Sequence, residues 1–169
     1  MTPSEIHELF LYNQWANRRS QGACEALTPE QFTRNLGSSF PSVRDTLAHI
    51  VRGEWIWLGR LRGQSDPPLP PGSEFPDLAA VRARLEELDS ALLQFVSELN
   101  AAGLERIVEY KSLAGEKFAD PLTPLLQHLV DHGTYHRGQV ATLLRQLGVK
   151  PASTGFVVFL RERAANAGK

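Results

Sequence analysis

Four segments of helical length, each followed by a loop, place the strongest constraint on the fold of this 169-residue chain. Thr2-Pro3-Ser4-Glu5 shows a typical helix start, with a capping hydroxyl, a proline at the first helical position and a glutamate three residues after the cap. Within each segment, apolar residues recur at the helical period. The expected helices cover about 2–26, 42–63, 77–102 and 123–148, with caps at Thr2, Ser42, Asp77 and Thr123.

The connections between these segments contain different signals. Thr28-Pro29-Glu30-Gln31 predicts a short helical turn, whereas the prolines of 64–72 exclude a helix or a central strand. Residues 104–119 predict a small β-hairpin that turns near Gly115, and 156–163 fits a short helix or a strand. The sequence therefore predicts an all-α fold, a four-helix bundle with one hairpin before the fourth helix, in a single domain over 1–169.

Composition and charge exclude several classes of protein. The chain has 18 Lys plus Arg against 19 Asp plus Glu, a net charge of -1, which gives no electrostatic footprint for nucleic acid. A single cysteine, Cys24, excludes an internal disulfide, and we expect it to be buried and inert. No signal peptide is recognisable at the N-terminus, and the apolar runs are too short to span a membrane. We therefore expect a cytoplasmic protein that binds neither nucleic acid nor membrane.

Three histidines at four-residue intervals, His128, His132 and His136, lie in the fourth expected helix. Side chains four residues apart differ by about 40° around a helix, so imidazoles at this spacing can bind one metal ion. His132 and His136 continue the apolar stripe of the helix, whereas His128 lies about 80° from His136. The pattern thus predicts that His132 and His136 point into the bundle. No Glu follows His132, so the general base of the HExxH zinc proteases is missing.

Two interpretations of this inward pair remain open from periodicity alone. A buried histidine is often a core residue that is hydrogen-bonded to a neighbour, but two of them one turn apart need partners for four ring nitrogens. Gly133 and Gly138 suggest close packing in the same helix. An open zinc site takes three protein ligands, and the third donor could be His49, His7, His128 or a carboxylate.

The residues around His49 and the second histidine group resemble the DinB (YfiT-like) family. The resemblance is carried by Ser42-Val-Arg-Asp-Thr-Leu-Ala-His-Ile-Val-Arg-Gly-Glu-Trp and by His128-Leu-Val-Asp-His-Gly-Thr-Tyr-His-Arg-Gly-Gln-Val, and it covers nearly the whole chain. It implies a bundle with an up-down-down-up course, commonly a homodimer. It also implies a divalent metal ion held by His49, His132 and His136, with His128 as a non-ligand.

The same resemblance suggests three functions. Members of the family include transferases and isomerases that use low-molecular-weight bacterial thiols, so the first hypothesis is a metal-dependent thiol transferase acting on small electrophiles. The alternatives are a metal-dependent hydrolase and a non-catalytic metal-binding module of a stress response. Three histidines suit several divalent ions, with zinc or nickel as the first choices.

The sequence identifies no catalytic residue beyond the expected ligands. A hydrolase would need a general base, for which Asp131 and Glu54 are candidates, although both are expected on the surface or behind the ligands. Arg137, next to His136, could hold an anionic substrate, but its position about 100° from His136 around the helix favours a salt bridge at the surface or at an interface.

Overall fold

Capping side chains determine where most of the long helices begin in the computed structural model, which describes residues 1–168. Thr2 and Glu5 form a complete capping box at the start of the first helix. Ser42 accepts a hydrogen bond from the backbone of Asp45, and Asp77 accepts one from the backbone of Ala80. The long helices that result are α1 (Pro3–Cys24), α3 (Val43–Leu61), α4 (Leu78–Ser97) and α6 (Leu122–Gln146).

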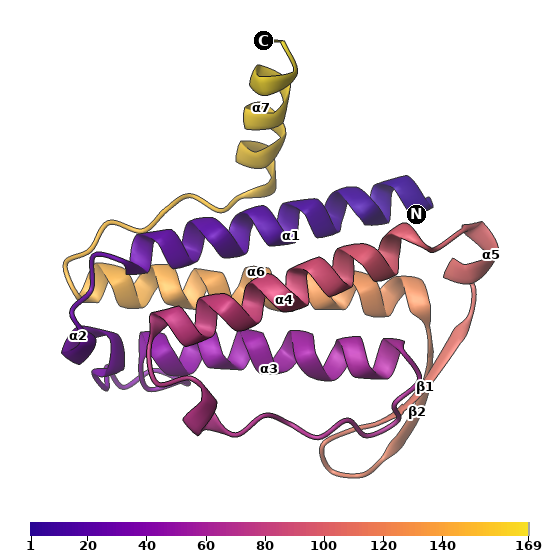
Figure 1. Cartoon of the computed structure of the whole chain (residues 1–169), viewed down its shortest axis with the longest axis horizontal. Helices are drawn as coiled ribbons and strands as arrows, with labels where there is room; N and C mark the ends of the chain where they lie inside the picture. The colour runs from indigo at the N-terminus through magenta and orange to yellow at the C-terminus, as the bar shows by residue number, and fades with distance from the viewer. Residues whose placement is uncertain (169) are drawn as a thin grey trace.

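These four helices form a bundle with an up-down-down-up course (Figure 1). Both α1 and α3 pack against α4 and α6, so each long helix has two long neighbours. Because α3 and α4 run in the same direction, the chain must return along the bundle between them, over residues 62–77. The remaining elements are α2 (Pro29–Thr33), the 3-10 turn η1 (Gly72–Glu74), α5 (Ala101–Leu104), β1 (Ile107–Lys111), β2 (Lys117–Pro121) and α7 (Phe156–Ala167).

The returning segment 62–77 is held against α3. The indole Nε1 of Trp55 donates a hydrogen bond of 2.8 Å to the carbonyl of Pro68. A Cβ atom at Gly59 would lie 2.7 Å from Cβ of Pro67, so the glycine lets the proline ring pack directly on the helix. The proline-rich segment 62–77 is therefore an irregular strap that is anchored along α3. This agrees with the prediction that 64–72 is not helical.

The hairpin confirms the prediction, whereas two helix ends differ from it. Strands β1 and β2 pair antiparallel, and Gly115 turns the chain between them with a φ of 86°. The third expected helix ends at Ser97 instead of near Ala102, because Asn100 caps a separate short helix, α5. The prediction of a cap at Thr123 was wrong: its hydroxyl donates to the carbonyl of Leu104, and α6 begins one residue after Pro121.

The closing segment forms a helix, α7, that projects away from the bundle (Figure 1). Phe159 is its buried residue, with ring centroids 5.8 Å from Tyr12 and 5.6 Å from Trp15 of α1. The indole of Trp15 also donates a hydrogen bond of 3.1 Å to Glu162. Other apolar side chains of α7 remain exposed, namely Phe156, Val157 and Leu160. Within residues 1–168, no helix is both long and apolar enough to cross a membrane.

A buried polar cluster joins all four long helices at the centre of the bundle. Arg137 of α6 donates hydrogen bonds of 2.8 and 2.7 Å to the amide oxygens of Asn13 and Asn17 on α1. The same two amides donate to Glu54 of α3 at 2.8 and 3.0 Å, and Asn17 also donates to Asp89 of α4 at 3.1 Å. The predicted surface position of Arg137 was therefore wrong, since only 2% of the residue is exposed. Glu54 likewise is fully buried.

Burial determines how the acidic members of this polar cluster titrate. Loss of water around Asp89, reinforced by the neighbouring Glu54 charge, raises the pKa of Asp89 to about 8. Burial also raises the pKa of Glu54, against the hydrogen bonds from Asn17 and Asn13. The guanidinium of Arg137 favours the charged form of both carboxyls and so opposes the effect of burial on their pKa values.

Asp89→Asn should therefore flatten the pH dependence of stability. An aspartate ionises near pH 4 in the unfolded chain, so between about pH 4 and about pH 8 the folded state holds one extra proton and stability falls as the pH rises. From about pH 6 to about pH 9, the wild type should lose on the order of 2 kcal/mol of unfolding free energy relative to Asp89→Asn. Urea unfolding at several pH values measures this difference, and parallel profiles for the two proteins would contradict it.

Candidate metal centre

Three imidazoles from two helices meet at one point on the side of the bundle. His49 comes from α3, and His132 and His136 come from successive turns of α6. Their ligand atoms all lie within 4.8 Å of one another, and the Nε2 atoms of His49 and His132 are 3.0 Å apart. The structure thus brings together the three residues that the resemblance implied, including the inward pair predicted from the helical wheel.

Gly53 makes room for one of these rings. It lies one turn after His49 on α3, facing α6. A Cβ atom built on Gly53 would lie 2.5 Å from Cε1 and 3.0 Å from Nδ1 of His132, closer than side chains approach one another. The absence of a side chain at Gly53 therefore lets the imidazole of His132 lie directly against α3, beside His49.

Neighbouring side chains orient the other two rings. Nδ1 of His136 lies 2.8 Å from Oε1 of Gln139, and since an amide oxygen accepts, Nδ1 carries the proton and leaves Nε2 free as a ligand atom. Phe40 stacks on His49 with ring centroids 4.2 Å apart and meets the edge of His136 at 5.5 Å. Sequence reasoning missed both neighbours. Gln139 lies three residues after His136 on the same helix face and could have been found by that spacing, whereas no pattern marks Phe40.

Burial keeps two of the imidazoles neutral. It lowers the pKa of His49 to about 4 and that of His132 to about 3, with the nearby His136 lowering both further. Neutral imidazole is the form that binds metal ions. Nδ1 of His132 is buried and has no hydrogen-bond partner within residues 1–168. Three convergent imidazole nitrogens, from His49, His132 and His136, fit a divalent metal ion.

The other candidate residues stand apart from this group. His128 is exposed and packs edge-on against Trp57, with ring centroids 5.3 Å apart, and His7 lies elsewhere on α1. Neither Glu54 nor Asp131 belongs to the histidine group: Glu54 is a member of the buried polar cluster, and Asp131 is exposed. Cys24 is buried, and burial raises the pKa of its thiol to about 12, as expected of an inert cysteine.

The two glycines of α6 that the sequence singled out differ in role. A Cβ atom at Gly133 would lie 2.7 Å from the Arg137 guanidinium and 2.8 Å from the amide oxygen of Asn13, so Gly133 admits the buried polar cluster. Gly138 faces open space, with no heavy atom within 4 Å of a Cβ built there. Close packing was thus predicted correctly for Gly133 and wrongly for Gly138.

Two cavities adjoin the histidines. One, of about 410 Å³, is lined by Phe40, Arg44, Asp45, Ala48, His49, Arg52, Gly72 and Ser73. The other, of about 320 Å³, is lined by His49, Arg52, Gly53, Ile56, Trp57, Arg60, Leu69, Leu113, His128 and His132. His49 lines both, so the histidine group is reached from two sides.

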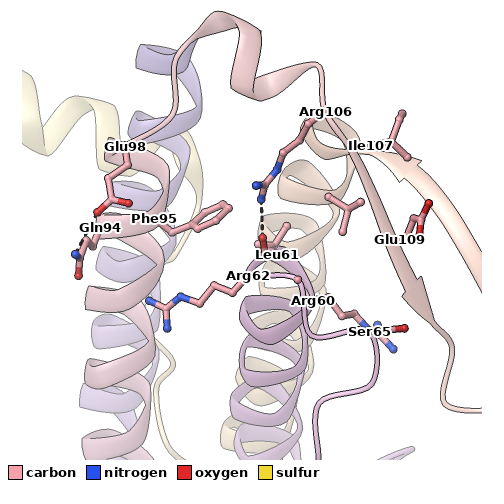
Figure 2. A pocket seen from close by; sticks show the side chains of 12 residues that line it. Arg60, Leu61, Arg62, Ser65, Gln94, Phe95, Glu98, Arg106, Ile107 and Glu109 are labelled. Carbon is pink, nitrogen blue, oxygen red and sulfur yellow. Dashed lines mark hydrogen bonds between the residues drawn. The ribbon is translucent and has the colours of Figure 1, made fainter.

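A further cavity of about 630 Å³ lies at the C-terminal end of α3, between α4 and β1 (Figure 2). Its lining within residues 1–168 contains no histidine. Figure 2 shows Arg106 donating to the carbonyl of Leu61, and Arg60 donates to the carbonyl of Lys111. These two arginines thus hold the hairpin against α3. The histidine group with its two adjoining cavities is the stronger candidate for a functional site.

Comparison with known proteins identifies the family of the chain. The model of the DinB family matches residues 1–166. Protein DinB of Bacillus subtilis is 27% identical over 163 residues, covering 90% of this chain and 92% of that protein. The uncharacterized protein YizA of the same organism is 21% identical over 150 residues, covering 89% and 92% of the two chains.

Solved structures share the fold. YfiT from Bacillus subtilis, described as a probable metal-dependent hydrolase with an unusual four-helix bundle topology, superposes with a TM-score of 0.64 at 15% identity, covering 88% of this chain and 90% of YfiT. A DinB-like protein from Bacillus cereus gives a TM-score of 0.62 at 20% identity, covering 82% and 90%. Because the family model matches almost the full length of the chain, the chain belongs to the DinB family.

Proposed function

We propose that this protein binds a divalent metal ion, zinc or nickel as first choices, through His49, His132 and His136, and transfers a low-molecular-weight thiol to small electrophiles. The observation that carries the proposal is the meeting of three imidazoles beside two cavities. A bound divalent ion lowers the pKa of a thiol or water that reaches its open position. Gln139 orients the ring of His136, and Gly53 leaves room for the ring of His132. The two adjoining cavities provide the space for the substrates.

The surroundings of the histidines favour a thiol over water as the nucleophile. Activation of water for hydrolysis is commonly helped by a general base close to the ligands. Both carboxylates considered for that role are placed elsewhere, Glu54 within the buried polar cluster and Asp131 on the exposed face of α6. A thiol has a much lower pKa than water and needs no such base once it ionises near the metal.

A hydrolase is the second candidate, because the structural relative YfiT is described as a probable metal-dependent hydrolase. A non-catalytic metal-binding module in a stress response is the third, since no catalytic residue has been assigned beyond the ligands. We also propose a homodimer, for which the exposed apolar residues Phe156, Val157 and Leu160 of α7 offer a contact surface. The cytoplasmic location stays a prediction from the sequence.

Removal of any one of the three histidines should abolish tight metal binding. His49→Ala, His132→Ala and His136→Ala should each weaken zinc or nickel affinity by more than about 100-fold, because loss of groups that only orient a ligand already costs about 10–100-fold. Competition with a chromogenic chelator measures this affinity. His128→Ala, which removes an exposed neighbour, should bind as the wild type does. Metal binding that survives in all three ligand variants would refute the centre.

Gly53→Ala should weaken metal binding although alanine is the better helix former. The added methyl group would overlap His132 and displace its ring, so we expect metal affinity to fall by about 10-fold or more, as when an orienting group is lost. The helix itself gains up to about 1 kcal/mol from the replacement of glycine by alanine. Gly138→Ala is the matched control, because it adds the same methyl group to a helix facing open space and should leave metal affinity unchanged. Equal metal affinity in the two variants would contradict this role of Gly53.

A thiol-dependent reaction distinguishes the three candidate functions. With 1-chloro-2,4-dinitrobenzene, the thiol sulfur forms a bond to the ring carbon, chloride leaves with the bonding electrons, and the thiol proton passes to solvent. We expect a metal-dependent acceleration of this reaction that is lost in His136→Ala, followed by absorbance with a panel of low-molecular-weight thiols. Acid release from model esters without thiol would favour the hydrolase instead, and no turnover in either assay would leave the non-catalytic module.

A further inference from the structure

Arg52 lines both cavities beside the histidine group. It lies three residues after His49 on α3, about 60° around the helix and one turn along it, and therefore on the same side. His49 and Arg52 are the two residues that the 410 Å³ and 320 Å³ cavities have in common. A molecule that occupies either cavity next to His49 thus meets the side chain of Arg52.

Within residues 1–168, the guanidinium of Arg52 forms no salt bridge and no hydrogen bond, in contrast to the other arginines that line these cavities. Arg44 binds Asp45 through Nε at 3.0 Å and through a terminal nitrogen at 2.7 Å. Arg60 donates to the carbonyl of Lys111 and lies over the ring of Trp57, 4.8 Å from its centroid. Arg52 forms no salt bridge within residues 1–168, and its Nε is buried there without a hydrogen-bond partner.

A partly buried arginine with free donors is a carboxylate receptor, because the planar guanidinium presents two parallel N–H groups at the spacing of the two carboxylate oxygens. Leaving the buried Nε donor without a partner costs free energy, which a bound anion that reaches it recovers. A carboxylate of a bound ligand would therefore be the partner of the Arg52 guanidinium.

The walls of the 320 Å³ cavity indicate the rest of that ligand. Ile56, Trp57, Leu69 and Leu113 present apolar side chains there. The ring of Trp57 is held in place by Arg60 on one side and by Tyr110, at a centroid distance of 5.2 Å, on another. Such a wall suits an aromatic or branched aliphatic group rather than a sugar or a phosphate.

We propose that Arg52 selects the substrate: it binds the carboxylate of a small organic acid whose apolar body lies against Trp57, next to the histidine group. This inference rests on the proposed function, because it names the substrate class of the same site. Arg52 would act as a specificity-determining residue and would take no part in holding the metal.

Calorimetric titration of the protein with two ligands of the same shape tests this assignment. 3-Phenylpropanoate carries the carboxylate and the aromatic ring, and 3-phenylpropanamide replaces the carboxylate by a neutral amide. Each is titrated into metal-free and into zinc-loaded protein. The wild type should prefer the carboxylate by at least about tenfold in both forms, since hydrogen bonds to a charged group contribute enough free energy for that ratio. Arg52→Gln should lose the preference.

Matched variants keep the test decisive. Arg44→Gln removes a cavity arginine that is already paired with Asp45, and it should keep the preference for the carboxylate. Should Arg52→Gln fail to fold, Arg52→Lys takes its place, and a preference reduced by about threefold or more supports the proposal, since the ammonium lacks the paired donors. A preference that persists in the Arg52 variants, or that only Arg44→Gln removes, overturns it.

The two proposals fail in different ways. A carboxylate bound directly by zinc would show its preference only in the zinc-loaded protein and would keep it in Arg52→Gln, which overturns the role of Arg52 while leaving the metal centre intact. Failure of the wild type to bind zinc or nickel would overturn the proposed function. The metal-free titrations would still decide whether Arg52 is a carboxylate receptor.

Discussion

The packing of the bundle depends on one buried charge, the guanidinium of Arg137. A cation in a bundle core is tolerated only when nearby groups compensate it, and here the compensation comes from three other helices, through Asn13, Asn17 and the carboxyls of Glu54 and Asp89. An apolar core can slide by a turn and still bury its area. A hydrogen-bonded cation with fixed partners cannot, so the polar cluster defines the register of α1, α3, α4 and α6, and with it the position of His136, the residue before Arg137.

The fold was predicted well from the sequence, whereas only part of the histidine group was. Helix starts are local events, and a capping side chain beside a proline marks them without knowledge of the tertiary structure. The inward phase of His132 and His136 was similarly visible, because the two continue an apolar stripe on their own helix. His49 required the family resemblance, since its partners lie on another helix. The surface position predicted for Arg137 was wrong for the same physical reason. Its burial depends on carboxyls and amides from α1, α3 and α4, and a helical wheel of α6 shows only the residues of α6.

Two glycines solve the same packing problem at two sites. Gly133 leaves space for the guanidinium of Arg137, and Gly53 leaves space for the ring of His132. In both places a polar side chain lies so close to the backbone of a helix that a Cβ atom on the glycine would overlap it. The buried polar cluster and the histidine group are therefore built by the same device, although one stabilises the bundle and the other faces the cavities. At Gly53 and Gly133, a glycine that is normally unfavourable in a helix interior admits a neighbouring polar ring or guanidinium.

The return of the chain over residues 62–77 has a consequence for how such proteins can diversify. The histidines come from α3 and α6, whereas Leu69, Gly72 and Ser73 of the returning strap complete the walls of the two cavities. Irregular connections tolerate insertions and changes of sequence better than packed helices do. The histidines and this part of the cavity walls are thus encoded in separate segments of the chain. Changes in the strap could therefore alter the shape of the cavities while His49 and Arg52 on α3 stay unaltered beneath it.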